Sequence, residues 1–301
     1  MKQFAFAFLA ILVLAMFSCK KDYQTISSYD DQTIQSYISA NHLTMMAGDS
    51  GIYYHIIKPG DTGNPLTDTD RIFYAFTVKT LDGKYISTDT VLNRVANYVG
   101  SNLTTLPFGL QYGLKKYLQR RNGIIQLLIP SKQAYGVSGF PSAKIPGNES
   151  LDYTVYLYNA DSQLAYDTIQ IRNYIKKNNL TGFKKTVSGL YYQILDGGSG
   201  KDQIYSTSSV TVTLNKGVLK NGTTTVVETT SPAAQNVGAF NSAGVREGLQ
   251  KINSGGKIRL LIPSDLGYGK NPASATAGDY NYKIPPASIL DYTINVTAVT
   301  N

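Results

Sequence analysis

Stretches in which apolar residues alternate with polar ones, or form short apolar runs, occur along this chain in two similar sets. Such stretches, rich in β-branched and aromatic residues, are typical of β-strands. The first set comprises IYYHII (52–57), RIFYAFTVKT (71–80), IIQLLIPS (124–131) and LDYTVYLY (151–158). The second set comprises LYYQIL (190–195), SVTVTLNKGVL (209–219), KIRLLIPS (257–264) and LDYTINVTAV (290–299). We therefore predict two groups of strands in the same order.

Apolar residues at helical spacing precede each group of strands. The segments 33–43 and 168–180 carry apolar residues three or four positions apart, which predicts a helix in each. Shorter helices are predicted over 109–118 and 243–252, because a glycine-containing pair follows each, as glycine commonly does at the end of a helix.

The two sets belong to an internal repeat. YISANHLT at 37–44 recurs as YIKKNNLT at 174–181, LLIPS occurs at 127 and 260, and LDYT occurs at 151 and 290. Chance does not preserve both the order and the spacing of so many motifs. With only two copies of a long repeat, we predict paired globular domains and not a solenoid.

One short helix among mostly antiparallel strands is typical of an α+β domain. We predict two tandem domains, each a curved antiparallel β-sheet packed over a short α-helix. The first would occupy 33–160 and the second 161–301, with 160–167 as the join between them.

Residues 1–18 have the pattern of a signal peptide. Lys2 precedes an apolar run at 4–17, and at 14 residues this run is short for a membrane-spanning helix. The rest of the sequence contains no apolar run that is longer than this one. We therefore do not expect an integral membrane protein.

Cys19, the single cysteine, stands where bacterial lipoproteins carry the cysteine that is lipidated. We therefore expect a lipid anchor at Cys19, followed by a linker at 19–32. Ser18 fits the lipoprotein motif, whereas Met16 and Phe17 depart from it. A plain secreted protein is the alternative.

Composition narrows the classes of function. With 42% hydrophobic residues and 16% charged residues, the chain can bury a core in each domain. Its net charge of +8 is spread in small clusters, so a nucleic-acid partner is not expected. The only histidines, His42 and His55, lie in separate elements without a carboxylate cluster, and no metal site is predicted.

The order of motifs in each copy resembles that of the FKBP-type peptidyl-prolyl isomerases. It runs through a strand, an Asp-Gly or Asn-Gly turn, a helix with two glycines, a Leu-x-Ile-Pro strand followed by Tyr-Gly, an Ile-Pro segment and a last strand with an aromatic residue. The resemblance implies the FKBP-like fold in both domains. It also implies peptidyl-prolyl cis-trans isomerase (rotamase) activity on proline-containing polypeptides, with no cofactor.

The resemblance further implies a peptide pocket in each domain. In the first domain the family's pocket positions fall on Phe76, Ile86, Leu106, Pro107, Leu110, Tyr135, Phe140, Ile145 and Tyr153. In the second domain they fall on Val245, Tyr268, Ile284 and Tyr292. In this family the tyrosine of the Tyr-Gly motif donates a hydrogen bond to a ligand carbonyl, so Tyr135 and Tyr268 would orient the peptide.

Such a pocket needs neither a nucleophile nor a metal. Rotation about a peptide bond faces a barrier of about 18–20 kcal/mol because the C–N bond is partly double. An apolar slot that strips water from the carbonyl disfavours the polar, planar form relative to the twisted one. A millionfold acceleration requires about 8 kcal/mol of differential binding of the transition state.

Several positions depart from the family pattern. The first copy has Ile86 and Ser87 where the family usually has an aromatic residue and an aspartate, and the chain contains no tryptophan for the pocket floor. The second copy has Asn215 where the first has Phe76, and an expanded polar stretch at 223–230. At 240–245 it has FNSAGV where the family has an apolar run, which removes part of the pocket wall. These departures favour activity in the first domain over the second.

We therefore expect a peptidyl-prolyl isomerase and folding helper for exported proteins, acting chiefly in the first domain. The alternative is a non-catalytic peptide-binding or scaffolding lipoprotein that keeps the fold with eroded pockets. A saccharide-binding role has only the 23 tyrosines in its favour. The expected location is the bacterial cell envelope, anchored by lipid in the outer membrane and facing the periplasm or the cell surface.

Overall fold

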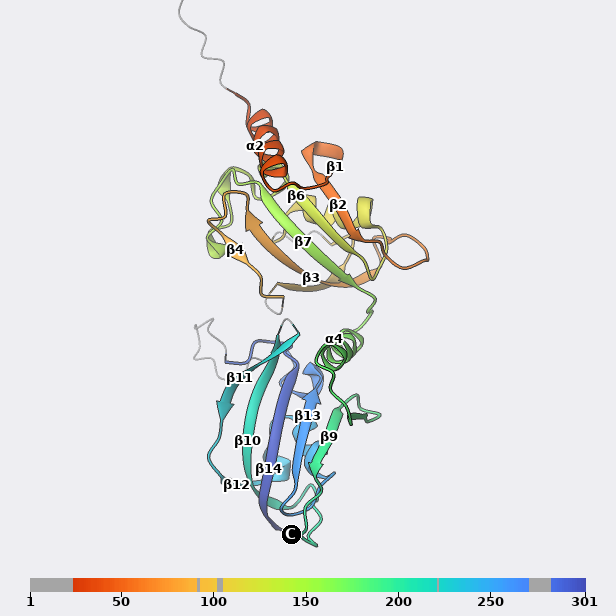
Figure 1. The fold of residues 1–301 in the computed structure, drawn as a ribbon, viewed down its shortest axis with the longest axis vertical. Coiled ribbons are helices and arrows are strands. Elements are labelled where there is room, and N and C mark those ends of the chain that lie inside the picture. Colours follow the sequence, from red (N-terminus) through yellow and green to blue (C-terminus); the bar gives the residue numbers. More distant parts are fainter. Residues whose placement is uncertain (1–23, 91–92, 102–104, 221, 271–282) are drawn as a thin grey trace, which may run out of the picture.

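The computed structural model describes residues 24–90, 93–101, 105–220, 222–270 and 283–301. The predicted signal peptide (1–18), Cys19 and the first part of the expected linker lie outside the described residues. Figure 1 shows two successive domains, each with its own twisted antiparallel sheet. A short helix packs on one face of each sheet, so the chain has the predicted α+β fold in two tandem domains.

The first domain contains one long helix, one short helix that continues as a π-helix, and seven strands. In chain order these are α2 (Ile26–Ala40), β1 (Met46–Ala47), η1 (Asp49–Gly51), β2 (Tyr53–Lys58), β3 (Arg71–Thr80), β4 (Ile86–Ser87), β5 (Arg94–Tyr98), α3 (Phe108–Gly113), the π-helix η2 (Leu114–Leu118), β6 (Ile124–Ile129), η3 (Ser131–Gln133), η4 (Gly136–Ser138), η5 (Pro141–Ala143) and β7 (Leu151–Tyr158).

The second domain repeats the order of strands and α-helices, without a counterpart of η1, η2, η4 or η5 among its described residues and with one additional short helix, η6. Its elements are α4 (Gln163–Lys177), β8 (Lys184–Lys185), β9 (Tyr191–Asp196), β10 (Ser209–Lys220), β11 (Thr223–Thr229), β12 (Ala233–Asn236), η6 (Val237–Ala239), α5 (Ala243–Leu249), β13 (Lys257–Ile262), η7 (Ser264–Leu266) and β14 (Leu290–Thr300).

The two sheets have the same topology. The first has the order β1-β2-β6-β7-β3-β4, with β5 also paired to β3. The second, read from its other edge, has the order β8-β9-β13-β14-β10-β11, with β12 also paired to β10. The internal repeat of the sequence is thus an internal repeat of the fold.

A pair of glycines brings the short helix close to the central strand in each domain. A Cβ atom added to Gly109 would lie 2.5 Å from Ile129, and one added to Gly113 would lie 2.7 Å from Leu127. In the second domain, a Cβ on Gly244 or Gly248 would meet the strand β13 at 2.5 or 2.6 Å. Because real Cβ contacts are longer than this, only glycine permits the observed packing. The core of each domain lies between this helix and the sheet.

A buried aspartate attaches each long helix to its sheet. Asp30 of α2 accepts hydrogen bonds from the amide and the hydroxyl of Ser131, at 3.0 and 2.7 Å. Asp167 of α4 accepts the same pair from Ser264, at 2.8 and 2.6 Å. The two serines end the LLIPS motifs. A buried carboxylate is tolerated only where donors replace water, and these serines supply them.

A second pair of contacts joins the other repeated motifs. The hydroxyl of Tyr37 donates to Asp152 at 2.9 Å, and the hydroxyl of Tyr174 donates to Asp291 at 3.1 Å. Each tyrosine opens the YIS or YIK motif and each aspartate belongs to LDYT. The motifs therefore recur together because they form one contact between helix and sheet.

Both long helices begin earlier than the sequence predicts. α2 begins at Ile26, where the hydroxyl of Thr25 accepts from the amide of Ser28, at 3.2 Å. α4 begins at Gln163, where the Ser162 hydroxyl caps it in the same way, so much of the expected join at 160–167 is helical. Both starts are set by N-cap side chains that apolar periodicity does not detect.

Contacts between the domains involve β5 and α4. Arg94 donates to the carbonyl of Ala287 at 2.8 Å and lies over the ring of Tyr166, 5.5 Å from its centroid. Phe73 of β3 stacks on the same Tyr166 at 6.0 Å, and Lys220 pairs with Asp89. The first domain therefore contacts the segment that follows Ile284 in the second.

Candidate functional site

The structure brings most of the predicted first-domain residues into one core. Four of them are buried together, and three more pack against that group as partly buried side chains: Phe76, Leu110, Ile145 and Tyr153 form the buried group, and Leu106, Tyr135 and Phe140 pack on it. Pro107 is buried at the start of α3. The aromatic residues are in mutual contact, with the rings of Tyr135 and Phe140 stacked at 4.9 Å.

Within this group, the tyrosine hydroxyls are bonded to the protein itself. Tyr135 donates to the carbonyl of Thr105 at 3.1 Å, and its oxygen lies 3.5 Å from the hydroxyl of Tyr153. Burial raises the pKa of both tyrosines above the ordinary value, so both remain neutral at physiological pH. The hydroxyl that was expected to orient a peptide thus has an internal partner.

Ile86 does not join the predicted pocket. Its side chain is 60% exposed. Ile86 lies on the edge strand β4 and pairs with Lys79 of β3. The neighbouring Tyr85 packs against the core in its place. Because successive side chains of a strand point to opposite faces, counting from the Asp-Gly turn placed the wall residue one position too late.

The second domain contains an open cavity at the equivalent place. Its volume is about 260 Å³, and three of the four predicted residues, Val245, Tyr268 and Tyr292, line it. Ile284 is buried in the same core cluster without lining the cavity. The other lining residues are Val212, Leu214, Lys216, Thr230, Ala233, Gln235, Ala239, Phe240, Asn241 and Ser242. The floor is apolar and one wall is polar.

Tyr292 differs from its first-domain counterpart Tyr153 in one respect. It is 1% exposed, yet its hydroxyl has no hydrogen-bond partner among the described residues. Burial raises the pKa of Tyr292, and the nearby Tyr268 hydroxyl adds to this effect. An unpartnered buried hydroxyl is uncommon because it costs about 1–3 kcal/mol. The hydroxyl is itself buried and lies near the Tyr268 side chain, which also lines the cavity.

The polar wall contains a residue that the sequence did not single out. Lys216 lies directly opposite Tyr292 on the paired strands β10 and β14, and so shares its face of the sheet. Asn215, expected at the pocket, lies opposite Thr293 and turns to the other face. The cause lies at the hairpin: Thr80 and Val218 hold equivalent positions opposite Leu151 and Leu290, but the Asn-Gly turn comes one residue later than the Asp-Gly turn. A separate bulge opposite Lys216 and Gly217 lies in β11, where Val227 is the extra residue.

Glycine is required at that bulge. A Cβ on Gly217 would lie 2.5 Å from Thr224 and 2.9 Å from the carbonyl of Asp291. Once the register is corrected, Leu214 is the counterpart of Phe76, since they lie opposite Ile294 and Val155 respectively.

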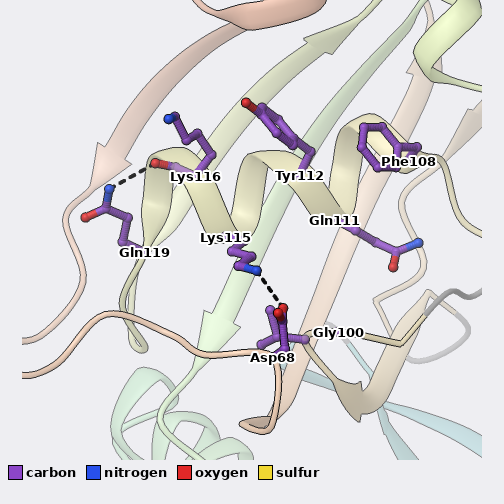
Figure 2. Close-up of a pocket in the computed structure, with 9 residues that line it drawn as sticks. Asp68, Gly100, Phe108, Gln111, Tyr112, Lys115, Lys116 and Gln119 are labelled. Carbon is purple, nitrogen blue, oxygen red and sulfur yellow. Dashed lines mark hydrogen bonds and ion pairs between the residues drawn. The ribbon is translucent and has the colours of Figure 1, made fainter.

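A larger groove lies elsewhere on the first domain. It has a volume of about 640 Å³ and runs along the outer side of α3 and η2. Figure 2 shows Lys115 turned toward Asp68, with an ion pair of 2.6 Å, and Gln119 bonded to the backbone of Lys116. None of the residues predicted for the peptide pocket lines this groove.

Two further observations concern metals and membranes. The described residues contain no group of three or more His, Cys, Asp or Glu side chains placed to hold a metal ion. No helix in the described part of the chain is long and apolar enough to cross a membrane.

Residues 200–297 match the family described as FKBP-type peptidyl-prolyl cis-trans isomerase. This range contains the cavity and all of its lining residues. Two curated relatives are similar to parts of the chain. The FKBP-type peptidyl-prolyl cis-trans isomerase FkpA of Buchnera aphidicola subsp. Schizaphis graminum is 34% identical over 137 residues, or 44% of this chain and 50% of the relative. A probable FKBP-type isomerase of Haemophilus influenzae is 38% identical over 118 residues, or 38% of this chain and 45% of the relative.

The chain thus spans about half the length of the curated relatives it matches. Among solved structures, FkpA from Escherichia coli aligns at 27% identity over 44% of this chain and 59% of its own, with a TM-score of 0.36. The three FKBP domains of wheat FKBP73 align at 17% identity over 85% of this chain and 99% of their own, with a TM-score of 0.33. The family match and the curated relatives support the FKBP-type peptidyl-prolyl isomerase family.

Proposed function

We propose that this protein is a peptidyl-prolyl cis-trans isomerase whose active pocket is the cavity of the second domain. The observation that carries the proposal is the cavity of about 260 Å³ lined by Val245, Tyr268 and Tyr292, inside the range that matches the family. The fit is chemical as well as spatial, since a proline ring is apolar and the peptide carbonyl beside it needs a donor.

The residues present can assist rotation of an X-Pro bond without covalent chemistry. The apolar floor, formed by Val212, Leu214 and Val245, would exclude water from the bound proline and from the carbonyl before it. Loss of that hydration disfavours the planar amide, whose resonance form is polar, relative to the twisted transition state. Tyr292 would donate its unpartnered hydroxyl to a carbonyl of the peptide, which holds the chain while the bond rotates.

The sequence favoured catalytic activity in the first domain, whereas the geometry favours it in the second. In the first domain the rings of Tyr135 and Phe140 stack on each other, and Tyr135 donates to the protein's own backbone. In the second domain the corresponding side chains line an open volume. Activity in the first domain stays a prediction that the assay below also tests.

The test is a protease-coupled isomerisation assay on a Leu-Pro tetrapeptide, with protein from Lys20 onward and two matched double variants. We expect acceleration by the wild type. Tyr268→Phe with Tyr292→Phe should lower kcat/KM about tenfold, at about 0.5–1.5 kcal/mol for each lost hydrogen bond. Tyr135→Phe with Tyr153→Phe should leave the rate within about twofold by the same reasoning, because its hydroxyls serve the protein.

The opposite pattern would return the activity to the first domain. A folded wild type that accelerates no peptide would favour the second candidate function, a non-catalytic peptide-binding or scaffolding protein. The internal bond of Tyr135 supports that role for the first domain in particular. Under this second candidate function, the first domain supplies an interaction surface and the second supplies the peptide-binding pocket.

We further propose that the protein acts on exported polypeptides while anchored to the cell envelope through Cys19. The support is the apolar run at 4–17, followed after Ser18 by the single cysteine. Metabolic labelling with a radioactive fatty acid tests this proposal. Label should enter the wild type and be absent from Cys19→Ser, whereas an unlabelled wild type would favour the secreted alternative.

A further inference from the structure

The second-domain cavity carries a charged residue where the first domain has an apolar one. Lys216 lies opposite Tyr292, and at the equivalent sheet position Val78 lies opposite Tyr153. Among the described residues that line the cavity, Lys216 is the charged one, and its side chain is 22% exposed. A partly buried ammonium group on a pocket wall must either be paired or meet a ligand of opposite charge.

The charge of Lys216 is already paired within the protein. Glu228 of β11 forms an ion pair with it at 2.8 Å and is 41% exposed. The hydrogen bond from Lys216 holds the pKa of Glu228 below its ordinary value, and Lys283 lowers it further. Lys216 is therefore paired with a carboxylate that is itself partly exposed to solvent.

Neutral polar groups extend the same wall. Thr230, Gln235 and Asn241 line the cavity beside Lys216 and can donate to oxygen atoms. They face the apolar floor across the cavity. The side chains of Tyr268 and Tyr292 lie near each other and also line the cavity.

We propose that this pocket selects proline peptides that carry a carboxylate side chain next to the proline. The inference rests on the proposed function, because it takes the cavity to be the proline site. The proline ring occupies the apolar floor, and the neighbouring carboxylate meets Lys216 and the amide groups of the polar wall.

The preference should be moderate. An exposed ion pair contributes little, and a buried pair costs desolvation, so a half-buried lysine that already has a partner lies between these cases. We expect about a fivefold higher kcat/KM for a Glu-Pro or Pro-Glu peptide than for its glutamine analogue, which is about 1 kcal/mol.

NMR exchange spectroscopy tests this on peptides with Glu, Gln or Leu on either side of the proline, because it needs no coupled protease. Lys216→Met should make the isomerisation rates of the Glu and Gln peptides equal, while the protein still accelerates isomerisation of the Leu peptide. Glu228→Gln should raise the ratio, since it frees Lys216. Lys201→Met changes the net charge equally at an exposed site and should keep the wild-type ratio.

Equal rates for Glu and Gln peptides in the wild type, or a ratio that survives Lys216→Met, would overturn the inference while leaving the proposed function intact. Absence of acceleration for every peptide would refute the proposed function instead. In that case, chemical-shift titration of the same samples still compares the affinities for Glu and Gln peptides. A higher affinity for Glu peptides supports the preference, and equal affinities refute it.

Discussion

Replacing Ser264 with alanine should weaken the attachment of α4 to the second sheet by about 1.5–3 kcal/mol, the usual value for a hydrogen bond to a charged group. The Ser264 hydroxyl donates to Asp167 at 2.6 Å, and both residues are 0% exposed. The variant leaves Asp167 two donors, the amide of Ser264 at 2.8 Å and the side chain of Gln163 at 2.7 Å. The loss of stability should therefore be smaller than the value of about 3–5 kcal/mol that is expected when a buried charge is left without a partner.

Hydrogen exchange followed by mass spectrometry can measure this effect domain by domain. Amides of α4 and β13 should exchange roughly 10 to 150 times faster in Ser264→Ala, because 1.4 kcal/mol corresponds to a factor of ten. Ser131→Ala should produce the same effect in α2 and β6, and Ser199→Ala, at an exposed turn, should produce none. A change below about 0.5 kcal/mol in Ser264→Ala, the usual range for surface substitutions, would refute the argument.

Three further predictions concern other contacts. Gly248→Ala places a Cβ 2.6 Å from Leu260 and should destabilise the second domain by about 1–3 kcal/mol in calorimetry; an unchanged melting temperature would contradict the close packing. Burial raises the pKa of Asp167, so its contribution to stability is fully present below the unfolded pKa near 3.8 and is lost as pH rises through the raised folded pKa. Asp167→Asn should remove that slope, of at most about 1.4 kcal/mol per pH unit, in denaturation curves from pH 3 to 7, and an unaltered slope would contradict the assignment. Arg94→Ala should speed amide exchange around Ala287 about tenfold and Arg94→Lys less, since Arg94 donates to that carbonyl at 2.8 Å; equal effects would count against the fork geometry.

Much of the fold could be predicted because the repeat exposes the motifs that hold each domain together. LLIPS and LDYT mark the paired central strands in both sheets. The glycines of the short helices mark the close contact of each helix with these strands. The partners of these motifs were harder to predict. Asp167 and Ser264 lie 97 residues apart. Nothing local in the sequence indicates that an aspartate of α4 is buried against the serine that follows β13.

The site residues were predicted less well, for a geometric reason. Ile86 and Asn215 were assigned to family positions by resemblance, and a shift of one residue reverses the face of a strand. Tyr85 packs inward in place of the first, and Leu214 and Lys216 flank the second on the inward face. The open cavity of the second domain depends on side-chain packing, which residue identity alone did not reveal.

Tyrosine-selective NMR tests the central claim, that the second-domain cavity binds proline peptides, most directly. Protein labelled with ¹³C at the tyrosine rings would be titrated with a Leu-Pro peptide, and the resonances would be assigned with Phe variants. The account predicts that Tyr268 and Tyr292 shift in a saturable way while Tyr135 and Tyr153 do not. Saturable shifts confined to Tyr135 and Tyr153, or no shift in any of the four, would contradict it.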